Sequence, residues 1–131
     1  MSHSPAKLFE EVVQMRERGF KAEDFAVRHL KKMGYKIITR NFSCRWGEID
    51  IIAQKGEYTV FAEVKLRKND SFGGGAAAVD RRKQERIKKT ASLYLSTLET
   101  EPPVRFDVVI ITAEGEKFKK ENVEIIENAF Y

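Results

Sequence analysis

The sequence predicts an α/β protein in which a mixed central β-sheet is flanked by α-helices. A hairpin-rich stretch at residues 35–67 indicates antiparallel strands, and residues 104–111 form an almost uniformly apolar strand of the kind that is covered on both faces. The helical pattern of residues 76–98 joins the two segments. Because a helix is the usual crossover between parallel strands, we expect parallel and antiparallel pairs in one sheet.

Two helices are expected before the sheet. Apolar residues recur at helical spacing in residues 5–18 and again in residues 20–33. Ser4 is placed to cap the first helix, and Gly19 and Gly34 are placed to end the two helices in turn.

The length of 131 residues is that of one independently folding unit. We therefore expect one domain at residues 19–131, preceded by a helical extension at residues 1–18. The strands of this domain are expected at residues 35–42, 47–53, 58–67 and 104–111, with a final strand or turn at residues 123–130.

Composition excludes several protein classes. Hydrophobic residues make up 42% and charged residues 34%, the balance of a soluble globular protein. No apolar stretch reaches membrane-spanning length, and residues 1–5 show no signal region, so we expect a cytoplasmic protein without a membrane partner. The single Cys44 forms no internal disulfide, and with His3 and His29 it makes no recognisable zinc set. Any metal would therefore be held by carboxylates.

Positive charge is concentrated at residues 81–89, where six cations face one anion, whereas the whole chain carries a net charge of +4. A basic helix face of this kind attracts phosphate backbones. A solvated, lysine-rich helix face explains the same pattern. The candidate nucleic-acid contacts are Arg67, Arg81, Arg82, Lys83, Gln84, Arg86 and Lys89.

The hairpin at residues 47–67 carries the clearest chemical signal. If its turn is centred between Lys55 and Gly56, the numbers of facing residues sum to 111. Asp50 then lies opposite Phe61 and diagonal to Glu63.

Strand alternation groups the acidic residues of this hairpin. Asp50, Glu63 and Lys65 fall on one face together with Glu48. Three converging carboxylates repel one another unless a cation lies among them, and Mg²⁺ or Mn²⁺ is the natural candidate. The opposite, apolar face is expected to carry Ile49, Ile51, Tyr58, Val60, Ala62 and Val64.

Lys65 points the same way as Glu63 and could orient a water or stabilise negative charge that develops on a phosphate. A charged pair on a solvated strand face is the simpler interpretation of Glu63 and Lys65 alone. Asp50 at the matching hairpin position favours the metal site, because the pattern then requires spacing across a turn as well as along a strand.

Two helices supply further candidates. Glu23 lies at the edge of the apolar face of its helix, where it could form a salt bridge or complete the acidic cluster. Lys83 precedes Ile87 on the buried side of the basic helix, which makes Lys83 and its neighbour Gln84 secondary site candidates.

Several short motifs, in the same order, resemble the YraN-like family of small bacterial proteins over residues 19–131. This resemblance implies a restriction-endonuclease-like fold of the PD-(D/E)xK nuclease type, similar to archaeal Holliday-junction resolvases. The motifs are Gly19-x-x-Ala22-Glu23-Asp24, Arg40-Asn41-Phe42, Gly47-Glu48-Ile49-Asp50, Phe61-x-Glu63-Val64-Lys65-x-Arg67, Val79-Asp80-x-x-Lys83-x-x-Arg86 and Arg105-Phe106-Asp107-Val108.

The resemblance also implies catalytic roles. Asp50 matches the first acidic strand position, Glu63 and Lys65 the Glu-x-Lys pair, and Glu23 the acidic residue of the first core helix. Asp50, Glu63 and the main-chain carbonyl of Val64 would hold the metal, supported by Glu23. The proline that gives the superfamily its name is absent, because Ile49 precedes Asp50.

We therefore expect a metal-dependent endonuclease, with DNA favoured over RNA and branched DNA such as Holliday junctions among its candidate substrates. Junction resolution needs two coordinated cuts, so that substrate would imply a homodimer. A non-catalytic nucleic-acid-binding module is the alternative, and an assembly partner that docks through residues 5–18 is a third. Trp46, Phe72 and Tyr94 could stack on single strands, or could simply pack.

Overall fold

The computed structural model describes residues 5–68, 79–114, 117–119 and 122–131, and within them the predicted α/β organisation is confirmed. No helix in this part of the chain is long and apolar enough to cross a membrane. The elements in chain order are α1 (Pro5–Lys32), β1 (Lys36–Cys44), β2 (Gly47–Lys55), β3 (Tyr58–Lys68), α2 (Arg81–Leu95), β4 (Val104–Ala113) and β5 (Val123–Phe130).

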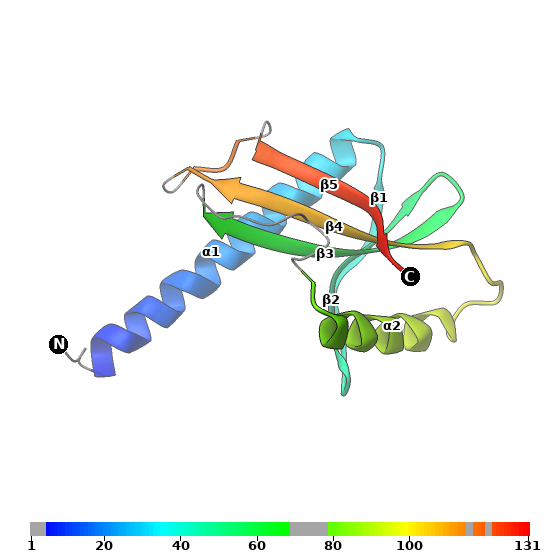
Figure 1. Cartoon of the computed structure of the whole chain (residues 1–131), viewed down its shortest axis with the longest axis horizontal. Helices are drawn as coiled ribbons and strands as arrows, with labels where there is room; N and C mark the ends of the chain where they lie inside the picture. Colours follow the sequence, from blue (N-terminus) through cyan, green and yellow to red (C-terminus); the bar gives the residue numbers. More distant parts are fainter. Residues whose placement is uncertain (1–4, 69–78, 115–116, 120–121) are drawn as a thin grey trace.

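The five strands form one sheet in the order β1-β2-β3-β4-β5 (Figure 1). β3 and β4 are parallel and the other three neighbouring pairs are antiparallel, so the predicted mixed sheet is confirmed. Helix α2 lies between the two parallel strands in the chain, as the crossover rule requires. The segment at 123–130, expected as a strand or a turn, is a strand.

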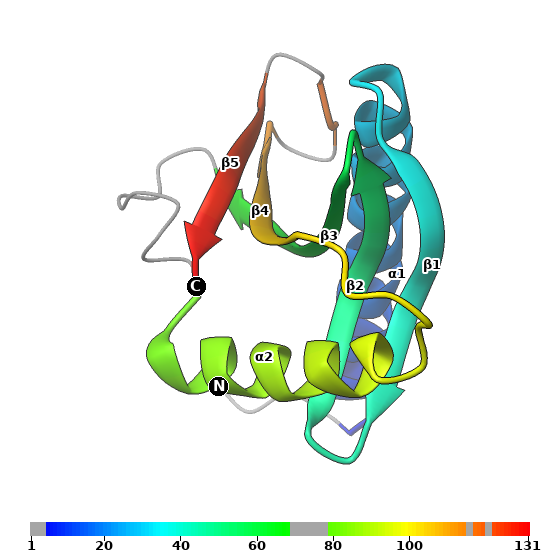
Figure 2. The ribbon, with the colours of Figure 1, turned by 90° about the vertical axis from the view of Figure 1, so that its right-hand side faces the viewer.

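The two helices pack on opposite faces of the sheet (Figure 2). Ala22, Ala26 and Leu30 of α1 are buried against one face, and Ile87 and Ala91 of α2 are buried against the other. The sheet therefore has an apolar core on both sides, as predicted for the strand at 104–111. The hairpin was predicted to have one apolar and one charged face, but its Ile52 and Phe61 are buried on the α2 side.

Helix α1 is continuous over 28 residues, so the prediction that Gly19 ends a first helix is wrong. Glycine inside a helix costs only about 1 kcal/mol relative to alanine, which the burial of the following turns readily offsets. Gly34 has a φ of +91° just past the helix end, so its predicted role as a stop is confirmed. Ser4 lies outside the described residues, and the boundary expected at residues 18–19 falls within α1.

The register of the β2–β3 hairpin also differs from the prediction. Lys55 pairs with Tyr58 around a two-residue turn, so the numbers of facing residues sum to 113 instead of 111. The turn contains Gly56, whose φ of +58° suits a tight hairpin. Extended by one residue past the last regular pair, this register brings Asp50 level with Glu63 instead of Phe61.

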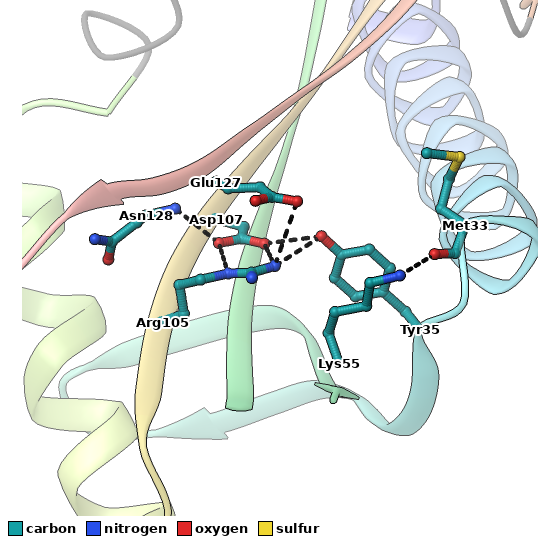
Figure 3. Close-up of polar contacts among 7 residues, drawn as sticks. All are labelled: Met33, Tyr35, Lys55, Arg105, Asp107, Glu127 and Asn128. Carbon is teal, nitrogen blue, oxygen red and sulfur yellow. Dashed lines mark hydrogen bonds and ion pairs between the residues drawn. The ribbon is translucent and has the colours of Figure 1, made fainter. Parts of the chain in front are cut away.

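A buried polar network around Asp107 of β4 joins Tyr35, in the segment between α1 and β1, to β4 and β5 (Figure 3). Asp107 is 1% exposed and accepts hydrogen bonds from Arg105 Nε at 2.9 Å and from an Arg105 terminal nitrogen at 2.8 Å. The Tyr35 hydroxyl donates to the same carboxylate at 3.1 Å, and the Asn128 N–H donates at 3.0 Å. Nearby, Lys55 at the hairpin turn donates to the Met33 carbonyl at the end of α1.

Candidate active site

Asp50 lies where strands β2 and β3 part. Regular pairing of the two strands ends at Ile51 and Ala62. One residue further, Asp50 Oδ2 accepts the main-chain N–H of Val64 at 2.8 Å, so a side chain replaces a ladder hydrogen bond. The alternation of β2 breaks here, and Ile49 packs on the α2 side while Ile51 packs on the α1 side. The prediction that these two isoleucines share a face is therefore wrong.

Asp50 and Glu63 form a pair of neighbouring carboxylates. Burial, and secondly the negative charge of Glu63, raise the pKa of Asp50 to about 7 from an ordinary value of 3.8. The Val64 N–H and the Lys83 ammonium act in the opposite direction without cancelling this rise. Glu63 itself is only 6% exposed. The buried Glu63 and the partly buried Asp50 thus lie side by side, and the nearby N–H and ammonium groups do not fully compensate their negative charge.

Lys83 supplies the positive charge that contacts this pair. Its Nζ lies 2.5 Å from Glu63 Oε1, and the pair joins α2 to β3. Burial lowers the pKa of Lys83, but the hydrogen bond and charge of Glu63 outweigh this and raise it overall. Asp80 caps the first turn of α2 by accepting the Lys83 N–H at 2.8 Å, which fixes where the helix begins. The sequence predicts α2 from residue 76, but residues 76–78 lie outside the described part and the helix starts at Arg81.

Glu23 approaches Asp50 from the α1 side. It is 8% exposed, and Arg40 Nε on β1 donates to its Oε1 at 3.3 Å. Burial and then the charge of Asp50 raise the pKa of Glu23, while Arg40 lowers it. Arg40 also contacts Asp24 at 2.6 Å. Glu23 therefore forms a salt bridge, which is one of the two roles predicted for it, and it lines the same hollow as Asp50.

Two hollows meet at Asp50 and Glu48. The first, the α1 hollow, has a volume of about 650 Å³ and is lined by Gly19, Ala22, Glu23, Asn41, Glu48, Asp50, Val64 and Leu66. The second, the α2 groove, has a volume of about 440 Å³ and is lined by Gly47, Glu48, Asp50, Glu63, Asp80, Arg82, Lys83, Arg86 and Ile87. The acidic pair is thus open to ligands from the side on which the basic residues lie.

The predicted nucleic-acid contacts separate into two groups. Arg82, Lys83 and Arg86 line the α2 groove, and Arg81 and Lys89 are exposed on the same helix. Gln84 instead donates to the Val79 carbonyl at 2.9 Å, a contact that holds the start of α2. Arg67 donates to Thr112 Oγ1 of β4 at 3.1 Å. Gln84 and Arg67 thus make structural contacts within the protein, and neither lines the α2 groove.

Lys65 is exposed on β3 two residues beyond Glu63 and is not among the described residues that line either hollow. Its predicted role rests on strand alternation and on the resemblance to the Glu-x-Lys pair. The lysine that touches the acidic pair is Lys83, which the sequence offers only as a secondary candidate. The available signal was helical spacing, because Lys83 stands one turn before the buried Ile87.

No three His, Cys, Asp or Glu side chains of the described residues lie close enough together to hold a metal ion. The expected three-carboxylate cluster is therefore replaced by the pair Asp50 and Glu63, because Arg40 holds Glu23 and Ser43 donates to the exposed Glu48 at 3.3 Å. Two carboxylates still fit Mg²⁺ or Mn²⁺, since Mg²⁺ is commonly bound through one or two carboxylates and several waters. Burial, and secondly the charge of Glu63, raise the pKa of Asp50, and a divalent cation between the two carboxylates would offset both effects.

Residues 22–111 match the model of a protein family described as uncharacterised protein family UPF0102. The chain belongs to this family. The match includes α2, all of β1 to β3 and most of β4, and therefore every residue of the acidic pair and the α2 groove. The predicted YraN-like membership is thereby confirmed.

Relatives of the UPF0102 family match most of this chain. A protein of Thermodesulfovibrio yellowstonii is 44% identical over 88% of this chain and 96% of its own length. One of Syntrophomonas wolfei is 45% identical over 88% of this chain and 98% of its own length. One of Dictyoglomus thermophilum is 50% identical over 73% and 82%, respectively. Each is named only as a UPF0102 protein, so chemistry must be argued from the site.

Proposed function

We propose that the protein is a Mg²⁺- or Mn²⁺-dependent endonuclease with a restriction-endonuclease-like, PD-(D/E)xK core that hydrolyses phosphodiester bonds in nucleic acid. The observation that carries this proposal is the juxtaposition of the acidic pair Asp50 and Glu63 with the cations of the α2 groove. Carboxylates beside a phosphate are unfavourable without a metal ion, and basic residues beside carboxylates suit a ligand that brings both phosphate and metal.

The chain's own residues have distinct tasks in this proposal. The Val64 N–H holds Asp50 in one orientation, and Lys83 holds Glu63. Arg82 and Arg86 bind the phosphate backbone along the α2 groove. A metal held by Asp50 and Glu63 would supply an activated water and would neutralise the scissile phosphate. Hydrolysis joins the water oxygen to phosphorus, breaks the bond to the leaving sugar oxygen, and returns a proton to that oxygen.

The test is a cleavage panel of linear, flapped and four-way DNA and RNA with Mg²⁺, Mn²⁺ or a chelator. We expect metal-dependent incision that falls by more than about 100-fold in Asp50→Asn and in Glu63→Gln. Glu57→Gln, which removes an exposed carboxylate at the far turn of the same hairpin, is the matched control and should cleave normally. Activity on four-way DNA should be accompanied by a homodimer in solution.

One outcome would reject the proposed active site, and another would reject the nuclease. Cleavage that survives both acidic substitutions places the chemistry elsewhere. Binding without cleavage of any substrate with either metal supports the alternative function, a non-catalytic nucleic-acid-binding module that uses the same basic groove.

A further inference from the structure

The turn between β1 and β2 carries an aromatic residue that the local geometry does not require. Arg45 and Trp46 are the two turn residues, since Cys44 pairs with Gly47. Two-residue hairpin turns favour Asn, Asp and Gly, which take up positive φ readily. Neither Arg45 nor Trp46 has a positive φ. The backbone of this turn therefore neither requires nor disfavours Trp46, the only tryptophan of the chain.

Trp46 does not pack in the apolar core. Its side chain is 37% exposed, and it belongs to neither of the two apolar clusters found among the described residues. Its ring contact is with the neighbouring Arg45, whose Cζ lies 4.5 Å from the ring centroid. Tyr94, by contrast, packs edge-on against Phe42 and Phe61, with centroids 5.5 and 5.9 Å apart. Phe72 lies outside the described residues.

The turn is fixed beside the basic helix. A Cβ placed on Gly47 would lie 3.6 Å from Arg86 Cβ and 3.8 Å from Thr90 Oγ1. On the other side of the turn, Cys44 Sγ lies 3.4 Å from the same Thr90 hydroxyl. Both ends of the turn therefore lie beside α2, at ordinary van der Waals distances. Arg45 and Trp46 add a cation and a ring to a surface that is already basic.

The turn also stands at one end of the α2 groove. Gly47 lines this groove together with Asp50 and Glu63. Asp50 follows Trp46 by four residue steps along the extended strand, a distance of about 13 Å. A strand of nucleic acid that follows the groove from the acidic pair would reach the ring within a few nucleotides.

We propose that the Arg45–Trp46 turn is a stacking site for an unpaired base, so that the preferred nucleic acid has single-stranded character beside the acidic pair. Aromatic rings next to arginine bind bases of any sequence through stacking and cation–π contacts, and the neighbouring cations bind the backbone. A base inside a duplex is already stacked and is not available to the ring. This inference rests on the proposed function, because it places the same substrate in the same groove.

Since the chain has one tryptophan, its fluorescence reports on this turn directly. We expect a short oligothymidylate to quench the Trp46 emission saturably in the presence of a chelator, where no cleavage occurs. A blunt duplex of equal length should bind the basic helix, as measured by the anisotropy of a labelled duplex, with little quenching. Equal quenching by the duplex, or no quenching by a bound single strand, would overturn the stacking site.

Substitutions give the second measurement. Trp46→Leu should weaken binding of the labelled single strand by roughly 5- to 100-fold and leave duplex binding unchanged. Trp46→Phe, which keeps a ring, should retain most of the affinity. The matched control is Tyr58→Leu, because Tyr58 is also 38% exposed beneath an arginine, Arg105 at 5.5 Å, but lies at the far end of the hairpin.

Wild-type affinity in Trp46→Leu would refute the stacking site whether or not the protein cleaves. Quenching and the Trp46→Leu loss without cleavage of any substrate would instead refute only the nuclease. Thermal unfolding of each variant shows that the comparison is made between folded proteins.

Discussion

Two carboxylates of this molecule, the buried Asp107 and the partly buried Asp50, have opposite surroundings. Asp107 accepts two hydrogen bonds from Arg105, one from the Tyr35 hydroxyl and one from the Asn128 N–H. Asp50 accepts one from the Val64 N–H and has a second acid, Glu63, as its neighbour. The first carboxylate is satisfied on every side, whereas the second keeps an excess of negative charge.

The contrast separates a structural site from a binding site. The Asp107 network joins the end of α1 to β4 and β5 and holds Asn128 at a φ of +52° (Figure 3). Burial, and secondly Asp107, raise the pKa of Tyr35 to about 12, so its hydroxyl stays a donor. Asp50 lies where the α1 hollow and the α2 groove meet, and it lacks the full set of hydrogen-bond donors and counter-charge that Asp107 has. Incomplete compensation in an open site is typical of a ligand-binding position.

The largest expected effect is at the satisfied site. Asp107→Asn leaves the Arg105 guanidinium, whose side chain is 12% exposed, without its buried counter-charge. We expect a loss of about 3–5 kcal/mol in the free energy of unfolding, measured by urea titration. The control Glu127→Gln, at an exposed acid 3.8 Å from Arg105, should change it by less than about 0.5 kcal/mol. A loss below 1 kcal/mol for Asp107→Asn would contradict the structural role of Asp107 and its contrast with Asp50.

Asp50→Asn should have the opposite effect and raise the free energy of unfolding. A carboxyl whose pKa is raised from 3.8 to about 7 binds its proton more tightly in the folded state, so its contribution to stability is present below about pH 4 and is lost as pH rises to 7. With metal chelated, we expect the variant to be more stable than the wild type at pH 8, by an amount on the order of 2 kcal/mol. The difference should vanish near pH 4, as followed by thermal unfolding. Destabilisation at pH 8 would mean that Asp50, like Asp107, is structural.

The smallest effect distinguishes the two lysines. Lys83→Gln removes the partner of Glu63, whose side chain is 7% exposed, and should lower the free energy of unfolding by about 1 kcal/mol at pH 8. Lys65→Gln should change it by less than about 0.5 kcal/mol, because Lys65 is exposed. A larger loss for Lys65→Gln than for Lys83→Gln would mean that Lys65, as strand alternation predicts, is the main partner of Glu63. Denaturant midpoints of the two variants settle the order.

The fold was largely predictable because its signals are local. Alternation and turn residues located the strands, and the long helix before the apolar strand at 104–111 predicted the parallel pair of β3 and β4. Gly19 was misinterpreted because the cost of one helical glycine is small beside the burial of the turns that follow. A weak local signal was thus overruled by packing.

The site was predictable in its residue types but not in its geometry. Placing the turn one residue away changes every cross-strand partner, which is why Asp50 is expected opposite Phe61, whereas the observed register, extended by one residue, brings it level with Glu63. The break in alternation at Asp50 depends on a side chain that replaces a main-chain acceptor, and no periodicity contains that information. Likewise, the contact of Lys83 with Glu63 depends on how α2 docks against β3.

The order of the strands has a consequence for how the chain folds. Every strand lies beside the one that precedes it in the sequence, so most pairings close short loops. Such a low contact order favours rapid folding, with β1, β2 and β3 assembling first as a meander. Only the pairing of β3 with β4 must wait for the intervening helix. The acidic pair spans β2 and β3, so its two acids can come together before α2 docks and brings Lys83 to Glu63.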